Sequence, residues 1–162
     1  AAQPGFNEPD FRSDTTRANC RTLAYHLKKA RETAPNGILG VNIMTKGFSY
    51  SDYAKCAVKN GADIIFSGAG LPADLPSYVK NTKTKIAPII SSARACSVLL
   101  KLWERHHQTT ADLVVIEGPK AGGHLGYSRE DIKRYEHQGY EEEIQKILSV
   151  VRHRRLCFQS PS

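Results

Sequence analysis

The stretch Ala-Asp-Ile-Ile-Phe-Ser-Gly-Ala-Gly-Leu-Pro, residues 62–72, decides the fold class of this chain. Its first half, Asp63 to Ser67, is nearly continuous in apolar residues, which is typical of a strand buried on both faces in a parallel sheet. The next three residues, Gly68-Ala69-Gly70, are small and typical of a turn. We therefore predict a β-strand over 63–67 whose carboxyl end opens into a small-residue turn.

Similar apolar runs lie on both sides of this stretch and alternate with helical patterns. Each helix is preceded by a residue that can cap it: Ser13 or Asp14, Ser49 or Ser51, and Ser91 or Ser92. Strands are predicted over 38–44, 86–90 and 112–116, a long loop over 117–140, and a final helix over 141–151. This alternation indicates a parallel sheet with helices outside it, and both a doubly wound sheet and a barrel satisfy the pattern.

The composition is that of an ordinary globular domain, with 40% apolar and 24% charged residues in 162. The net charge of +7 comes from scattered basic residues rather than from a basic stripe interleaved with aromatics, so we expect no nucleic-acid partner. No apolar run approaches the roughly 18–20 residues of a spanning helix, so we expect no membrane association and a cytoplasmic protein. The four cysteines form no CxxC pair; we predict no metal site, and interpret Cys20, Cys56 and Cys96 as small apolar residues on helix faces.

Small and polar residues follow four successive predicted strands. In parallel folds the functional residues gather at the carboxyl ends of the strands, where such residues leave room for a ligand. The candidates, in chain order, are Asn42, Ser67, Gly68, Ser91, Gly122, Gly123 and His124.

A dinucleotide fingerprint is superficially present as Gly68-x-Gly70-x-x-Ala73. That fingerprint needs an immediate helix and an acidic residue at the end of the next strand. Pro72 stands where the helix should run, and the next strand ends in Ser91-Ser92. We therefore do not interpret this segment as a Rossmann site.

The most informative segment is Ala-Gly-Gly-His-Leu-Gly at residues 121–126. Paired glycines allow the backbone to approach a flat or anionic group closely. Imidazole is the natural general base near neutral pH, so His124 is the catalytic candidate. The alternative interpretation is that His124 is a solvent-exposed turn residue.

Four segments together resemble the nitronate monooxygenase family, formerly called 2-nitropropane dioxygenase, which is close to the FMN-containing enoyl-acyl-carrier-protein reductases. These segments are residues 40–44, 62–72, 86–92 and 115–126, and the resemblance extends from about Glu8 to Arg152. It implies a (β/α)8 TIM barrel with FMN at the carboxyl ends of the strands. This chain then carries about four parallel strands, the family's third to sixth.

The resemblance also implies roles for individual residues. His124 matches the family's catalytic base or proton donor, Gly122 and Gly123 match glycines beside the flavin, and Asn42 matches a polar residue near the flavin ring. Ser67, Gly68 and Ser91 line the pocket by position only. The implied reaction is the oxidation of alkyl nitronates, as small-molecule substrates, by O2 to a carbonyl compound and nitrite. An FMN-dependent enoyl-acyl-carrier-protein reductase and a non-catalytic fragment are the alternatives.

We expect residues 1–162 to form a single partial barrel with irregular ends at 1–13 and 156–162. The family's first two and last two strands, including the loops that hold the FMN phosphate, are expected to lie outside this sequence. The chain alone is therefore predicted to bind FMN weakly, and a homodimer that pairs two half-barrels is conceivable.

Overall fold

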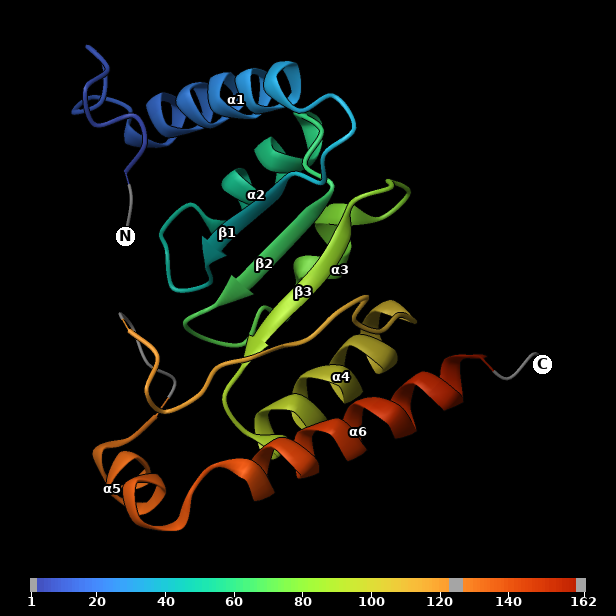
Figure 1. Cartoon of the computed structure of the whole chain (residues 1–162). Coiled ribbons are helices and arrows are strands. Elements are labelled where there is room, and N and C mark those ends of the chain that lie inside the picture. The colour runs from blue at the N-terminus through green and yellow to red at the C-terminus, as the bar shows by residue number, and fades with distance from the viewer. Residues whose placement is uncertain (1–2, 123–126, 160–162) are drawn as a thin grey trace.

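The computed structural model describes residues 3–122 and 127–159 and contains one four-stranded parallel sheet (Figure 1). The strands are β1 (Gly40–Met44), β2 (Ile64–Gly68), β3 (Lys85–Ile90) and β4 (Val115–Ile116). Each strand pairs with the one before it in the sequence, so the spatial order is β1-β2-β3-β4. A doubly wound sheet reverses its strand order at a switch point, whereas successive neighbours are the pattern of a barrel. The described strands therefore confirm the predicted partial (β/α) barrel.

Six helices accompany the described strands: α1 (Thr15–Thr33), α2 (Tyr50–Lys59), α3 (Leu75–Val79), α4 (Ala93–His107), α5 (Arg129–Gln138) and α6 (Glu141–Gln159). The connections α2, α3 and α4 contact the strands, while α1 packs on α2 and α6 packs on α4 (Figure 1). Two predicted caps are confirmed. The Asp14 side chain accepts a hydrogen bond from the Arg17 backbone N–H, and the Ser92 side chain accepts one from the Ala95 N–H.

The two faces of the sheet differ in what covers them. The register pairs Ile43 with Ser67 and Ile65 with Ile86, and these residues face the helices in a buried core. Trp103 of α4 is fully buried there, as predicted. The opposite face, the inner face of the barrel, carries residues that are exposed or half-buried at most of its positions: Gly40, Asn42, Met44, Phe66 and Ile89.

Three differences from the sequence-based expectation exceed a shift of one or two residues at the end of an element. The fourth strand is limited to Val115–Ile116, because the Asp112 and Leu113 N–H groups both reach the Ile86 carbonyl instead of continuing the ladder. The predicted loop over 117–140 contains α5, which a capping box between Ser128 and Asp131 begins. The predicted irregular end at 156–162 is wrong as far as Gln159, because α6 continues to that residue.

Candidate functional site

The candidate site lies where the carboxyl ends of the four strands meet at one edge of the sheet, which we call the carboxyl edge. Backbone hydrogen bonds join neighbouring strands at this edge: the Thr45 N–H donates to the Gly68 carbonyl at 2.8 Å, and the Glu117 N–H donates to the Ile90 carbonyl at 2.9 Å. The segments that follow the strands therefore start close together. The sequence-based expectation of one shared edge is met for the described residues.

Asn42 lies on the inner face of β1, where its side chain is exposed beside the half-buried ring of its register partner Phe66. Met44 and Ile89 add half-buried apolar groups to the same face. An exposed amide next to a partly exposed apolar surface can hold a flat heterocycle, which needs both stacking area and hydrogen bonds.

Gly68 ends β2, and the side chain of Ile89 leaves no room for a larger residue there. A Cβ at this position would lie 2.9 Å from the Ile89 Cβ, closer than side-chain carbons approach. The following Ala69 (φ 56°) and Gly70 (φ 138°) have left-handed or related backbone conformations, and for Ala69 this is strained. The Trp103 indole N–H holds the end of this turn by donating to the buried Pro72 carbonyl at 3.0 Å.

The Ser67 side chain does not face the predicted flavin pocket. It is fully buried on the helix-facing side, where its hydroxyl lies 3.0 Å from the Ile43 carbonyl and 2.8 Å from the Tyr50 hydroxyl. Burial raises the pKa of Tyr50 to about 12, so this pair of hydroxyls stays neutral. The expectation that Ser67 lines the pocket is corrected by this geometry: its side chain joins β2 to β1 and α2.

Ser91 and the start of α4 are held by residues of α6 and of the segment before it. The Ser91 carbonyl accepts a hydrogen bond from the Tyr140 hydroxyl at 2.8 Å. The Ala93 N–H, in the first turn of α4, donates to Glu143 Oε1 at 2.7 Å. A helix amino terminus is a common site for phosphate groups. Here a carboxylate of the chain itself already occupies that position.

Three tyrosines form a cluster at the tip of β4 that the sequence analysis did not anticipate. The rings of Tyr127, Tyr135 and Tyr140 meet edge to face, with centroids 5.0–6.0 Å apart. The Tyr127 and Tyr140 hydroxyls both donate to the Glu117 carbonyl, the latter at 3.1 Å. Burial raises the pKa of both tyrosines, so both remain donors at neutral pH. The cluster fixes the strand tip from which the glycine-rich segment starts and to which Tyr127 returns.

Within that segment, Gly122 is exposed, and a Cβ added to it would meet nothing within 4 Å. Gly123 and His124 lie outside the described residues, so their predicted roles stay predictions. Among the described residues, none packs against Gly122 in a way that requires glycine, in contrast to Gly68.

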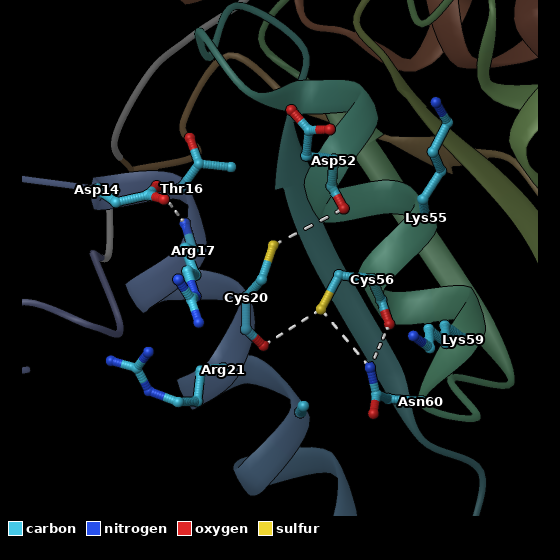
Figure 2. A pocket seen from close by; sticks show the side chains of 11 residues that line it. Asp14, Thr16, Arg17, Cys20, Arg21, Asp52, Lys55, Cys56, Lys59 and Asn60 are labelled. Atoms are coloured by element: carbon cyan, nitrogen blue, oxygen red, sulfur yellow. Dashed lines mark hydrogen bonds between the residues drawn. The ribbon is translucent and has the colours of Figure 1, made fainter. Parts of the chain in front are cut away.

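A second hollow lies away from the carboxyl edge, between α1 and α2 (Figure 2). It has a volume of about 820 Å³ and is lined by Cys20, Cys56 and a mixture of basic and acidic side chains. Over residues 3–122 and 127–159, no group of three potential metal ligands comes together. Nor is any helix in that part of the chain long and apolar enough to cross a membrane.

The fold is that of a segment of a (β/α) barrel, and the candidate site lies at the carboxyl ends of its strands. The sequence profile described as Nitronate monooxygenase matches residues 15–152, and the chain belongs to that family.

Solved structures of FabK agree with this assignment at the level of the fold. FabK from Thermotoga maritima superposes with a TM-score of 0.58 and 24% identity, over 67% of this chain and 32% of that one. A point mutant of the same protein superposes with a TM-score of 0.57 and 24% identity, over 66% of this chain and 34% of that one. The chain thus spans about a third of the length of these structures. Among functionally curated proteins, none matches the sequence.

Proposed function

We propose that this chain forms the third to sixth strands of the flavin site in an FMN-dependent oxidoreductase that oxidises alkyl nitronates with O2 to a carbonyl compound and nitrite. One observation carries the proposal: in a chain of the nitronate monooxygenase family, four consecutive strands end at one edge with an open inner face beside small and polar residues. Ligands of parallel (β/α) folds bind at this edge.

The described residues fit the ring of FMN better than its phosphate. Asn42 supplies an exposed amide beside the half-buried Phe66, and Gly122 leaves open space for a flat group. The amino terminus of α4 is filled by the Glu143 carboxylate, which would repel a phosphate. We therefore assign Asn42, Gly68, Ser91, Gly122 and Gly123 to the surroundings of the ring and leave the phosphate to residues outside this sequence. When bound, FMN supplies the electron-accepting chemistry.

The chain's own contribution is proton transfer and positioning. We assign His124 the role of accepting a proton from the carbon next to the nitro group of a neutral nitroalkane, since imidazole titrates near neutral pH. Tyr127 and Tyr140 hold the Glu117 carbonyl at the start of this segment. Because they contact the backbone at Glu117, we assign both tyrosines a positioning role.

Oxygen consumption tests the proposed reaction. The chain is saturated with FMN, and O2 uptake is followed after addition of a pre-ionised alkyl nitronate. The proposal expects uptake that requires both FMN and nitronate and that releases nitrite. Oxidation of NAD(P)H coupled to reduction of a conjugated double bond, without nitronate-dependent uptake, would favour the reductase alternative. Neither reaction, together with no bound flavin, would mean that this chain is not catalytic.

The His124→Ala variant tests the assigned base. Turnover of a neutral nitroalkane should fall by about 10²–10⁴, while turnover of the pre-ionised nitronate should change little because its proton is already removed. His106→Ala is the matched control, since His106 is an exposed histidine at the far end of α4. Unchanged neutral-nitroalkane turnover in His124→Ala would remove His124 from the mechanism.

A further inference from the structure

The hollow between α1 and α2 contains two thiols that the proposed function does not use. Cys20 on α1 and Cys56 on α2 both project into the space between the helices (Figure 2). The Cys56 Sγ lies 3.2 Å from the Cys20 carbonyl oxygen, and the Cys20 Sγ lies 3.9 Å from the Asp52 carbonyl oxygen. Each sulfur therefore contacts the backbone of the opposite helix, which brings together two cysteines 36 residues apart in the sequence.

Both thiols are accessible, in contrast to Cys96. Cys20 and Cys56 are half-buried, whereas Cys96 is fully buried on the core-facing side of α4. The hollow, at about 820 Å³, is open and has room for a small reagent. A small reagent can therefore reach the first two thiols but not the third.

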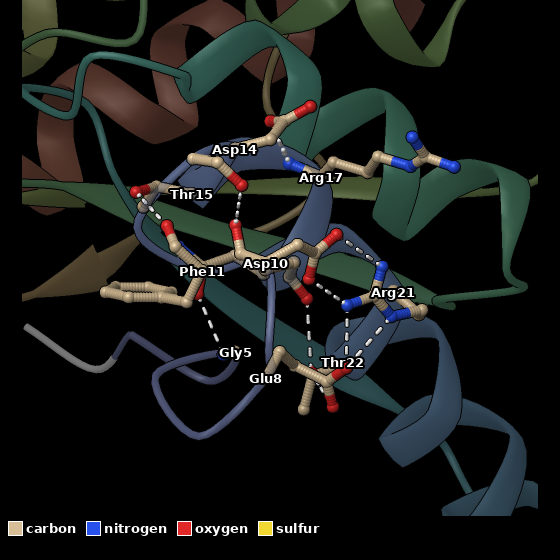
Figure 3. Close-up of polar contacts among 12 residues, drawn as sticks. Gly5, Glu8, Asp10, Phe11, Asp14, Thr15, Arg17, Arg21 and Thr22 are labelled. Atoms are coloured by element: carbon tan, nitrogen blue, oxygen red, sulfur yellow. Dashed lines mark hydrogen bonds and ion pairs between the residues drawn. The ribbon is translucent and has the colours of Figure 1, made fainter.

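The rim of the hollow carries charged groups of both signs. Arg17, Arg21, Lys55 and Lys59 line it against Asp14 and Asp52. Arg21 is engaged by Glu8 at 2.6 Å and by Asp10 at 2.5 Å (Figure 3). With these two carboxylates the acidic groups around the hollow number four and equal its four basic groups, so the rim selects a reagent by access and not by charge.

We propose that Cys20 and Cys56 form an oxidisable dithiol that exchanges with a small disulfide and closes into a covalent bond between α1 and α2. In the first step the Cys56 thiolate attacks one sulfur of the reagent, forms a mixed disulfide and displaces one reagent thiolate. In the second step the Cys20 thiolate attacks the Cys56 sulfur, forms the Cys20–Cys56 bond and displaces the other. The two cysteines lose two protons and two electrons, and the reagent disulfide is reduced to two thiols.

The surroundings of the two sulfurs set the order of these steps. The Asn60 side-chain amide donates to the Cys56 sulfur at 3.6 Å and holds it beside the Cys20 carbonyl. Burial raises the pKa of Cys20 to about 12, with Cys56, Asp52 and Asp14 adding to the effect. Cys20 is therefore a poor first nucleophile and acts second, within the mixed disulfide. Because its thiolate fraction increases with pH, ring closure should accelerate about tenfold per pH unit near neutrality.

Glutathione disulfide is the test reagent, and the protein is the full chain. It carries Cys157→Ser, because the Cys157 side chain lies outside the described part and its thiol would also react. Peptide mapping should find one bond joining Cys20 to Cys56, with Cys96 still free. The midpoint of thermal unfolding should increase by about 5–15 °C and return with dithiothreitol, because the bond closes a long loop. Cys96→Ala is the matched control and should form the same bond.

Single substitutions separate the two steps. In Cys20→Ser the glutathione adduct should remain on Cys56, because nothing displaces it. In Cys56→Ser the reaction at Cys20 should slow by at least about tenfold. A persistent adduct in the protein that keeps both cysteines, a bond to Cys96, or an unchanged rate in Cys56→Ser would overturn the proposal.

Discussion

The two edges of the sheet are built from different chemistry. At the amino edge, where the strands begin, carboxylates join neighbouring strands: Asp63 Oδ2 accepts the Leu39 N–H at 2.8 Å and pairs with Arg31 at 2.6 Å. Asp112 makes the same kind of contact between β3 and β4: its carboxylate accepts the Ile86 N–H and pairs with Lys85, both at 2.9 Å. At the carboxyl edge the described contacts to the strand ends come largely from hydroxyls and backbone amides.

This difference separates stability from ligand binding. The ion pairs of the amino edge occupy the space between strand ends and fix the strand pairing. Small residues at the carboxyl edge leave the inner face open, which a ligand requires. Substitutions at the amino edge should therefore lower stability without touching the proposed FMN site, and the reverse should hold for exposed residues of the carboxyl edge.

The largest loss of stability is expected at Trp103, because this core residue also holds the turn after β2 at the carboxyl edge. Trp103→Ala should lower the free energy of unfolding by about 3–5 kcal/mol, because it leaves a cavity and an unpaired Pro72 carbonyl. Trp103→Phe keeps most of the volume and should cost about 1–3 kcal/mol. Urea unfolding measures both. Both variants lose the indole N–H, so equal losses would mean that the lost volume contributes nothing measurable beyond the lost hydrogen bond.

Gly68 and Gly122 sharpen the comparison within the carboxyl edge. Gly68→Ala should cost about 1–3 kcal/mol, because its Cβ would meet that of Ile89 at 2.9 Å. Gly122→Ala meets open space and should change stability by less than about 0.5 kcal/mol, while weakening FMN binding. Paired thermal unfolding and flavin-fluorescence titrations check this. A lower unfolding temperature in Gly122→Ala than in Gly68→Ala would contradict the assignment of Gly68 to packing and of Gly122 to ligand binding.

The amino edge should be sensitive to acid. The Leu39 N–H and the Arg31 guanidinium lower the pKa of Asp63 below its ordinary 3.8, so its stabilising effect is complete above that value and is lost as the pH falls through the lowered pKa. Asp63→Asn should cost about 1 kcal/mol or less near pH 6, since the pair is half-exposed, and the difference should vanish near pH 2. Affinity for FMN should stay unchanged. A pH-independent difference in unfolding free energy would contradict this prediction.

Two further substitutions distinguish the faces of the sheet. Ser67→Ala should cost about 1 kcal/mol through its lost hydrogen bonds and leave FMN affinity as it was. Asn42→Ala, on the open inner face, should lower FMN affinity and leave the free energy of unfolding nearly unchanged. Isothermal titration and urea unfolding of the two variants provide the measurements. Reduced FMN affinity in Ser67→Ala alone would restore Ser67 to the pocket.

Much of the fold could be predicted from the sequence, because strands buried on both faces leave continuous apolar runs and helix caps leave Ser or Asp at fixed places. The orientation of Ser67 was also within reach, since it lies two residues from the buried Ile65 and so shares its face. The α5 helix was missed because its residues are polar and its only clear signal is the Ser128–Asp131 capping box.

The tyrosine cluster could not be predicted in the same way. Its three members come from a loop, a helix and the connection after that helix, and no periodicity relates them. Only the packing of α5 and α6 against the strand tips brings these rings together on the Glu117 carbonyl.

Backbone amide chemical shifts during titration of the nitrogen-15-labelled chain with FMN test the central claim directly, because they detect even weak binding. The account predicts shift changes concentrated at the carboxyl edge, at Asn42, Gly68, Ser91 and Gly122, with Leu39, Asp63 and Lys85 unaffected. Changes centred on the amino edge or on the α1–α2 hollow, or none at about 1 mM FMN, would contradict it.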